Sequence, residues 1–407
     1  MNAPPIEDGA VIVSDGKIES VTKRAAVPAD IPREEHPESI LLPAFVNAHT
    51  HLAYTSFRGL ADNADFFSWL TEHVIPLGIP EREEEGRLSA RLGVTECFRH
   101  GITAVGEQHY VPWGRDAMLE AGMKGVFFYE VFGIASLNLG RSVAEQREQI
   151  EKLVRESSDR VRTGVAPHAP YSVSPAMVAM ALELAQKHGL PIATHVAETR
   201  DEVELFLRGE GRFATVRRSV TIPGLNCSLT PVEHFDKLGV LTPNTMIVHG
   251  VHVSDSDLDL ISGRGCTMVT CPTSNAKLGV GIARVGSWMN RGIRTCIGTD
   301  SPASGETFDL FEEMRRFLLL QRGLTGETDR FPAATVLEMV TTNPARALGM
   351  QDMVGDLRSG SCADLLLVEP DLDERHRYRD VYETLLWDVT SQEIVKVWAD
   401  GREVYRR

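Results

Sequence analysis

The sequence is poor in cysteine and has no long apolar run, and each absence excludes a class of protein. Six cysteines are scattered over 407 residues, at positions 97, 227, 266, 271, 296 and 362, and none of them forms a CxxC pair. This distribution predicts buried free thiols in a reducing compartment rather than a disulfide framework. No apolar stretch approaches the length of a membrane-spanning helix, so we expect no transmembrane segment.

Positive charge is also in deficit. The chain has 42 Lys and Arg against 57 Asp and Glu, a net charge of −15, which argues against nucleic acid or an anionic membrane as a partner. The first residues, MNAPPIEDGA, lack the basic start, apolar core and cleavage site of a secretory signal. With 43% hydrophobic and 24% charged residues, the composition indicates a large globular protein with a sizeable core. We expect a cytoplasmic protein.

The middle of the chain alternates between two hydrophobic periods. Helical patterns with apolar residues at spacings of three and four occupy residues 87–100, 175–188 and 308–321, among others. Short apolar runs typical of buried strands lie at 44–48, 103–106, 125–131, 162–166, 191–195, 245–249, 266–270 and 295–298. Strands that alternate with helices in this way predict a parallel (β/α)8 barrel, an α/β fold whose chemistry sits at the carboxyl ends of its strands.

Both ends of the chain have a strand, turn and strand pattern instead. Residues 11–13 and 18–21 flank an Asp15-Gly16 turn, and residues 394–398 and 403–405 flank Asp400-Gly401, after a further strand at 363–368. We therefore expect one small β-sandwich domain built from both termini. The predicted division is residues 1–42 and 351–407 for the sandwich and residues 43–350 for the barrel.

The first strand of the predicted barrel ends in His49-Thr50-His51. Side chains at i and i+2 of a strand point the same way, so both imidazoles face one point from a stiff backbone. Imidazole is the commonest protein ligand for a divalent transition metal. The same spacing also occurs in a pair of partly exposed histidines at a strand end that bind no metal. Further ligands elsewhere in the chain are needed to distinguish the two interpretations.

Other strands of the predicted barrel also end in polar residues. These are His168 after strand four, His195 and Glu198 after strand five, His249 after strand six, Cys271 to Asn275 after strand seven, and Asp300 after strand eight. Barrel stability needs nothing polar at this end. The pattern therefore favours an active site.

These motifs, PAFVNAHTHL, HVAE, VHG, CPTSNAKLG and GTDS, resemble those of the amidohydrolase superfamily, in the expected order and over the whole chain. The resemblance is to the branch of S-adenosylhomocysteine and adenosine deaminases, aminofutalosine deaminases, guanine and cytosine deaminases, and triazine chlorohydrolases. It implies that His49, His51, His195 and Asp300 bind one divalent metal, either zinc or Fe(II), with water in an open position. Strand four has no lysine to bridge two metals, which favours one ion.

The resemblance also implies the catalytic roles. Glu198 protonates a ring nitrogen of the substrate, His249 orients or deprotonates the nucleophilic water, and Asp300 is the final proton acceptor. Ammonia then leaves the ring carbon that the water attacks.

Substrate contacts are expected from Trp69, in the loop after strand one, from His168, and from Arg141 after strand three. Trp69 can instead belong to the apolar face of a short helix, and Arg141 can be a solvated side chain. Related deaminases hold the ribose hydroxyls with an acidic residue where this chain has Gly78. The substitution leaves room for a modified nucleoside or for a heterocycle without a ribose.

The sequence therefore predicts a metal-dependent hydrolytic deaminase that acts on the C–N bond of a cyclic amidine. The expected partner is a small heterocyclic substrate of the adenine nucleoside type, such as S-adenosylhomocysteine, adenosine or aminodeoxyfutalosine. The alternative is a chlorohydrolase or aminohydrolase of triazine-like heterocycles, guanine or cytosine on the same scaffold. An inactive barrel that serves as a binding protein is a third hypothesis, which metal content would test. A homodimer is a family-level expectation.

Overall fold

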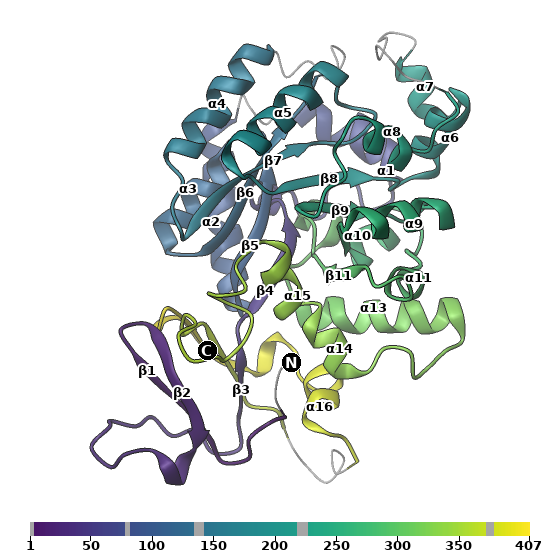
Figure 1. Cartoon of the computed structure of the whole chain (residues 1–407). Helices are drawn as coiled ribbons and strands as arrows, with labels where there is room; N and C mark the ends of the chain where they lie inside the picture. Colours follow the sequence, from purple (N-terminus) through teal and green to yellow (C-terminus); the bar gives the residue numbers. More distant parts are fainter. Residues whose placement is uncertain (1–3, 78–81, 134–141, 218–226, 372–377) are drawn as a thin grey trace.

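A closed ring of parallel strands forms the centre of the protein (Figure 1). The computed structural model describes residues 4–77, 82–133, 142–217, 227–371 and 378–407. Its eight-stranded sheet runs in chain order from β4 to β11, with parallel neighbours throughout. The strands are β4 (Phe45–Thr50), β5 (Ile102–His109), β6 (Lys124–Val131), β7 (Val161–Pro167), β8 (Ile192–Val196), β9 (Thr245–His249), β10 (Thr267–Thr270) and β11 (Arg294–Ile297). The predicted (β/α)8 barrel is confirmed.

The last strand closes onto the first through a seam of close backbone contacts. The Asp300 N–H donates to the His49 carbonyl at 3.1 Å, and the Asn47 side chain donates to the Thr299 hydroxyl at 2.7 Å. A Cβ at Gly298 would lie 2.9 Å from the His49 Cβ, so only glycine fits where β11 approaches β4. The seam therefore brings the ends of β4 and β11 together.

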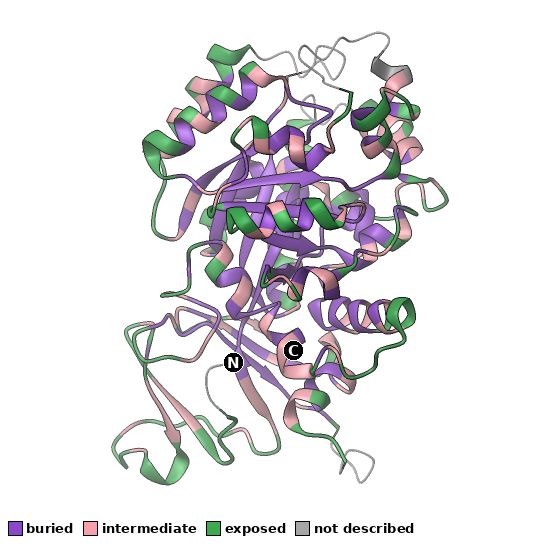
Figure 2. Ribbon diagram, turned by 45° about the vertical axis from the view of Figure 1, so that its right-hand side comes forward, coloured by how far each residue is buried: buried purple, intermediate pink, exposed green. Residues whose placement is uncertain are grey.

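Helices cover the outside of the barrel, with buried inner faces and exposed outer faces (Figure 2). The longer ones are α2 (Glu83–Arg99), α3 (Trp113–Ala121), α4 (Val143–Arg155), α5 (Pro175–His188), α6 (Arg200–Arg208), α9 (Asp255–Arg264) and α13 (Leu310–Thr325). Shorter ones are α1 (Phe66–Ser68), α7 (Arg212–Arg217), α8 (Pro231–Lys237), α10 (Pro272–Lys277), α11 (Val285–Met289), α12 (Pro302–Gly305), α14 (Ala333–Glu338), α15 (Thr342–Ala347) and α16 (Val381–Trp387). None of the helices in the described part of the chain combines the length and apolar character needed to cross a membrane.

The sequence explains the ends of α5, which match the predicted range. The Ser174 hydroxyl accepts the Met177 N–H, Pro175 occupies the first turn, and Gly189 ends the helix in the left-handed conformation at φ 65°. The predicted ranges of two other helices were displaced. Helix α2 begins at Glu83 rather than at residue 87, because a run of acidic residues occupies its first turn, and Asp309 caps α13 so that it begins at Leu310.

Two strand ends were also predicted too short, and the difference matters for the site. Strand β4 continues through His49 to Thr50, and β5 continues past residue 106 to His109. Glu107, Gln108 and His109 are therefore strand residues at the carboxyl end of the barrel, beyond the predicted end of this strand at residue 106.

The two chain termini meet in antiparallel sheets below the barrel (Figure 1). The hairpin of β1 (Gly9–Ser14) and β2 (Lys17–Lys23) forms one sheet. The other has the order β14 (Arg402–Arg406), β13 (Ile394–Ala399), β12 (Leu365–Val368) and β3 (Ile40–Pro43). Ile18, Ala363 and Leu365 form the apolar cluster shared by these strands. Both termini thus contribute to this β unit, while the division at residues 42 and 350 stays a prediction.

A buried ion cluster joins the barrel to this β unit. Lys124, the first residue of β6, is 1% exposed, and its ammonium lies 2.8 Å from Asp364 and 2.7 Å from Asp400. All six cysteines are free thiols, as predicted, although Cys227 is exposed and Cys362 is only partly buried.

Candidate active site

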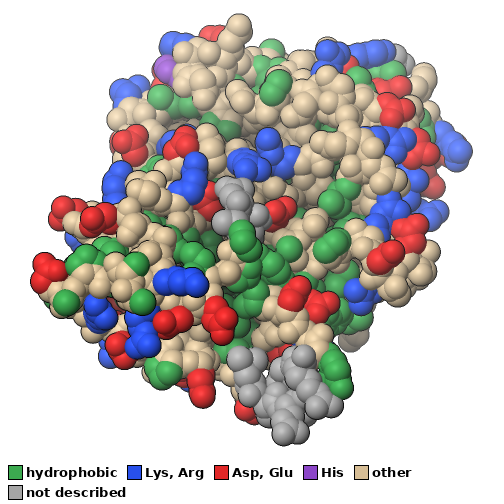
Figure 3. All heavy atoms as spheres, turned by 60° about the horizontal axis from the view of Figure 1, so that its bottom comes forward, with side chains coloured by type: hydrophobic (Ala, Val, Ile, Leu, Met, Phe, Trp, Pro, Cys, Tyr) green, Lys and Arg blue, Asp and Glu red, His purple; other side chains and the backbone are tan. Residues whose placement is uncertain are grey.

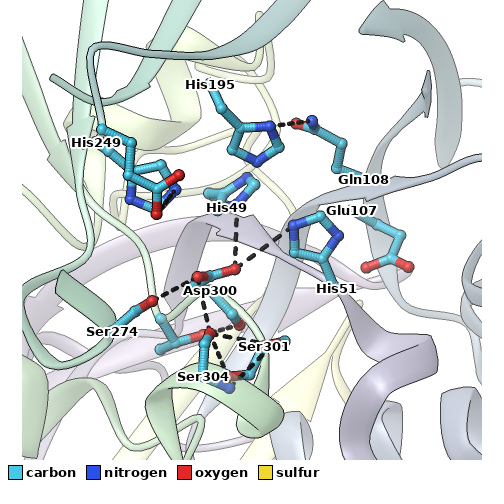
Figure 4. Close-up of polar contacts among 12 residues, drawn as sticks. His49, His51, Glu107, Gln108, His195, His249, Ser274, Asp300, Ser301 and Ser304 are labelled. Atoms are coloured by element: carbon cyan, nitrogen blue, oxygen red, sulfur yellow. Dashed lines mark hydrogen bonds and ion pairs between the residues drawn. The ribbon is translucent and has the colours of Figure 1, made fainter. Parts of the chain in front are cut away.

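Three histidines and one carboxylate converge at the carboxyl end of the barrel (Figure 4). The Nε2 atoms of His49 and His51 each lie 3.5 Å from Asp300 Oδ1. One ring nitrogen each of His49, His195 and His249 lies within 4.8 Å of the other two. The structure therefore brings together all four predicted metal ligands and the predicted catalytic histidine.

Two serines hold the Asp300 carboxylate from behind. The hydroxyls of Ser274, on α10, and Ser304, on α12, donate to Asp300 Oδ2 at 2.7 and 2.8 Å (Figure 4). Oδ2 is thereby occupied, and Oδ1 is left to face His49 and His51. Sequence reasoning named Ser274 only as part of the motif after strand seven. It assigned this residue no role and so missed its contact with Asp300.

The backbone fixes the tautomer of His195. Its Nδ1 lies 3.1 Å from the carbonyl oxygen of His168, which can only accept, so Nδ1 carries the hydrogen and Nε2 has the free lone pair. Gln108 Nε2 also lies near Nδ1, at 3.3 Å, but it is a donor, so the hydrogen bond of Nδ1–H is the shorter one to the carbonyl. An imidazole held this way is ready to bind a cation through Nε2.

The chemistry of these donors fits one divalent metal ion. Burial lowers the pKa of His49 to about 4 and that of His195 well below its ordinary value, so both imidazoles are neutral. Burial would raise the pKa of Asp300, but its contact with His49, at 3.5 Å, and the nearby histidines hold that pKa well below its usual range. His49 Nε2 is buried without a hydrogen-bond partner in the described chain. The 3.5 Å from Asp300 Oδ1 to the Nε2 atoms of His49 and His51 is a separation at which these three atoms could share one ion.

Glu198 faces His249 across this cluster. One carboxylate oxygen lies 3.6 Å from His249 Nε2, and the side chain is 4% exposed. Burial, followed by the charges of Asp300 and Glu202, raises the pKa of Glu198 well above its ordinary value. A carboxyl group that keeps its proton near neutral pH can act as a general acid and base.

A second glutamate that the sequence reasoning did not single out holds the turn that carries Glu198. The two carboxylate oxygens of Glu202 accept the N–H groups of Ala197 and Glu198, at 3.0 Å each. Ala197 has φ 51°, a left-handed conformation that costs a residue with a Cβ on the order of 1 kcal/mol. The Thr199-x-x-Glu202 spacing of a helix start was the available signal, because the Thr199 hydroxyl caps α6.

An asparagine orients His249. Asn275 Oδ1 lies 2.9 Å from His249 Nδ1, so this nitrogen donates and Nε2 faces the site with a free lone pair. Burial lowers the pKa of His249, which keeps the ring neutral and able to accept a proton. His249 at φ 71° and Asp300 at φ 59° are left-handed, like Ala197. The ends of β8, β9 and β11, where the chemistry is expected, thus each have one residue in this conformation.

Two polar side chains that the sequence reasoning missed lie on the other side of the cluster. Glu130, at the end of β6, is 3% exposed, and Gln108, on β5, donates to its Oε1 at 3.1 Å. Burial raises the pKa of Glu130. The only sequence signal was an acidic residue inside the apolar run 125–131.

The predicted substrate contacts have different outcomes. His168 reaches the site, where its ring stacks on Phe132 at 4.4 Å and lies 4.9 Å from the His195 ring, and burial lowers its pKa to about 3. Trp69 is buried against Phe66, and its Nε1 has no hydrogen-bond partner in the described chain. Arg141 and Gly78 lie outside the described residues. Substrate contact by these residues stays a prediction.

Comparisons with known proteins agree with this geometry. The profile of the amidohydrolase family matches residues 40–404. A 5-methylthioadenosine/S-adenosylhomocysteine deaminase of Halalkalibacterium halodurans is 31% identical, over 98% of this chain and 89% of its own. A 5'-deoxyadenosine deaminase of Methanothermobacter thermautotrophicus is 30% identical, over 100% of this chain and 91% of its own.

Solved structures show the same fold. An adenosine deaminase from Xanthomonas campestris with bound zinc has a TM-score of 0.85 and 27% identity, over 98% of this chain and 88% of that one. An atrazine chlorohydrolase from Arthrobacter aurescens also has a TM-score of 0.85, but at 20% identity, over 98% of this chain and 90% of its own, it shares only the fold. The barrel, the converging histidines and the match over nearly the whole chain agree, and the chain belongs to the amidohydrolase family.

Proposed function

We propose that the protein is a metal-dependent hydrolytic deaminase of adenine-type nucleosides. The observation that carries the proposal is the convergence of four potential metal ligands with a buried, proton-holding Glu198 and a neutral His249. The relatives at 30% and 31% identity are named as deaminases of adenosines modified at the 5' position, which supports this substrate class. They favour a deaminase over a triazine chlorohydrolase, whose structures share the fold alone.

His49, His51, His195 and Asp300 would hold the ion. We propose zinc, with Fe(II) as the alternative, because neutral imidazoles and one carboxylate suit both. Bound there, the ion would supply the Lewis acidity that lowers the pKa of water towards about 7. Ser274 and Ser304 keep Asp300 in the orientation that this role requires.

The protein's own groups would move the protons. Glu198 gives its proton to the ring nitrogen next to the reacting carbon, which makes that carbon a better electrophile. His249 Nε2 orients the water and accepts its hydrogen bond, because Asn275 keeps the hydrogen on Nδ1. Asp300 takes the final proton. His168, Trp69 and Arg141 would contact the substrate.

The test is ammonia release over a panel of amino heterocycles by the enzyme loaded with zinc or iron. The panel holds 5'-methylthioadenosine, S-adenosylhomocysteine, 5'-deoxyadenosine, adenosine, aminodeoxyfutalosine, guanine, cytosine and an aminotriazine. We expect an adenine nucleoside to give the highest kcat/KM. No release from any adenine nucleoside with metal fully loaded would contradict the proposal.

Metal content tests the ligand assignment separately from turnover. We expect about one ion per chain in the wild-type protein and almost none in His195→Ala, measured by elemental analysis after gentle purification. Unchanged metal content in His195→Ala would show that the ion binds elsewhere. The homodimer and the cytoplasmic location also stay proposals, and light scattering of the purified protein tests the first.

A further inference from the structure

Glu130 is a buried acid in the site that the scheme above does not use. It ends β6, and one of its oxygens lies within 4.8 Å of a ring nitrogen of His51 and of one of His195. A carboxylate that is 3% exposed costs free energy unless a partner compensates it. Its position beside the proposed metal ligands means that a partner could come from a bound ion, since Glu130, His51 and His195 lie close enough to share one, or from the substrate.

Among the described residues, only Gln108 donates a hydrogen bond to Glu130, and it reaches one of the two carboxylate oxygens. Gln108 Nε2 donates to Oε1 at 3.1 Å, and His168 Nε2 is 3.9 Å from the same atom, beyond hydrogen-bond distance. No hydrogen bond reaches Oε2 from any residue that the structure describes. Glu130 thus offers one fixed oxygen and one free acceptor next to the site.

In the barrel, Glu130 lies on the side opposite the residues that would orient and deprotonate the water. His249 and Asp300 follow β9 and β11, and β10 lies between these two strands. In a ring of eight strands that runs in chain order, β6 lies opposite β10. Glu130 and Gln108 therefore face His249 and Asp300 across the mouth of the barrel.

In the proposed reaction, the amino group leaves from the side of the ring opposite the attacking water. The oxygen of water forms a bond to the ring carbon, one water proton reaches the ring nitrogen through Glu198, and the carbon becomes tetrahedral. Asp300 takes the second proton and passes it to the amino group, the C–N bond breaks, and ammonia leaves as the carbonyl forms. Because water adds from the side of His249 and Asp300, the amino group bends towards the opposite side, where Glu130 lies.

We infer that Glu130 Oε2 accepts a hydrogen bond from the reacting amino group and so selects substrates whose leaving group is ammonia. The inference rests on the proposed deaminase function and extends it from the heterocycle to the leaving group. An amino group has N–H donors that satisfy the buried carboxylate. A chlorine in the same place has only lone pairs, which the carboxylate repels, and it leaves Oε2 unpaired.

The variant Glu130→Gln tests the proposed hydrogen bond, because the contact with Gln108 determines the orientation of the new side-chain amide. The Gln108 N–H needs an acceptor, so the carbonyl oxygen of the new side chain faces Gln108 and its NH2 group faces the substrate. The measurement is kcat/KM for adenosine, by ammonia release, and for 6-chloropurine riboside, by chloride release. Loss of a charged acceptor should lower the value for adenosine roughly 10–100-fold. The value for the chloro compound should not fall, since the repulsion by the carboxylate is gone and a neutral N–H donor tolerates chlorine.

Binding gives a readout that does not depend on turnover. In a Glu198→Gln background, calorimetry measures the dissociation constants of adenosine and 6-chloropurine riboside with and without Glu130→Gln. The ratio of the two constants should shift against adenosine, with metal content unchanged. Glu148→Gln, an exposed glutamate on α4, is the matched control and should alter neither compound.

The outcomes separate the inference from the function on which it rests. An equal loss for both compounds, or a loss for neither, would overturn the role of Glu130 while leaving the deaminase function intact. Failure of the wild-type enzyme to release ammonia from any adenine nucleoside would overturn the proposed function and this inference together. A loss confined to the amino compound, in turnover and in binding, is the supporting result.

Discussion

Several functional side chains in this site are oriented by hydrogen bonds with one or two neighbours. Asn275 sets the tautomer of His249, and the His168 carbonyl sets that of His195. Ser274 and Ser304 turn Asp300. These supporting groups fix which atom of each functional residue faces the site, and they matter for metal affinity and activity nearly as much as the ligands themselves.

At this scale the sharpest prediction concerns Glu198. Glu198→Gln keeps the size of the side chain but removes the proton that the mechanism moves, so we expect kcat to fall about 10²–10⁴-fold. Metal content should not change, because Glu198 is not among the proposed ligands. Near wild-type turnover in this variant, measured with the metal content checked, would show that another group moves the proton.

A buried glutamate outside the site predicts how stability depends on pH. Glu313 on α13 accepts the Thr273 N–H at 3.2 Å, and burial raises its pKa from 4.5 to about 8. Between these values the folded state holds a proton that the unfolded state has released. The free energy of unfolding should therefore fall with rising pH, by about 1.4 kcal/mol per pH unit for this group.

Glu313→Gln should remove that part of the slope, so its stability relative to the wild type should rise with pH up to about pH 8 and then level off. Urea unfolding of both proteins at pH 6, 7 and 8 measures it. Glu312→Gln, its half-exposed neighbour, should follow the wild-type slope. Parallel curves for wild type and Glu313→Gln would refute the raised pKa.

At the scale of elements, the connection from β8 to α6 determines the orientation of Glu198. Glu202, in the first turn of α6, binds the backbone N–H groups of Ala197 and Glu198, and burial raises its pKa to about 7 although these amides lower it. We therefore expect Glu202→Gln, which turns an NH2 group towards a backbone N–H, to lower kcat roughly 10–100-fold. KM and metal content should change little.

A double mutant distinguishes aiming from folding. If Glu202 acts through Glu198, adding Glu202→Gln to Glu198→Gln should cause no further loss of kcat. Glu204→Gln, exposed on the same helix, is the control. Additive losses, or a drop in metal content that parallels the loss of activity, would assign Glu202 a purely structural role.

The order of these elements could be read from the sequence, whereas several of their ends could not. Apolar runs of strand length located all eight barrel strands because buried parallel strands need nearly continuous apolar residues. The same rule ended β5 too early, since Glu107, Gln108 and His109 are polar yet buried in the sheet. The proposed ligands come from motifs, and the contacts of Glu202 are local, within five residues. Glu130 and Asn275 instead make contacts between distant segments, which local patterns do not encode.

At the scale of the whole molecule, charge is mixed rather than segregated on the face that Figure 3 shows. Acidic and basic side chains alternate there around smaller apolar areas. No extended basic surface is visible on that face, in keeping with the predicted small-molecule partner.

The buried ion cluster around Lys124 joins the barrel to the β unit, so we expect its loss to destabilise the protein. Lys124→Met would leave Asp364 and Asp400 without their ammonium, and removing one partner of a buried pair costs about 3–5 kcal/mol. We expect a lower melting temperature, measured by calorimetry, and normal kcat in the protein that remains folded. Lys152→Met, an exposed lysine on α4, should melt like the wild type. An unchanged melting temperature for Lys124→Met would mean that water reaches the two carboxylates and solvates them.

The seam between β4 and β11 has a consequence for biosynthesis. His49 leaves the ribosome early, but its partner across the seam, Asp300, follows only after seven further strands have been translated. A nascent chain that has not yet exposed Asp300 holds the proposed imidazoles without the acid that completes the set. Loading of the proposed ion by all four ligands would therefore be a late event, and a molecule that holds it in this way would be one whose barrel has already closed.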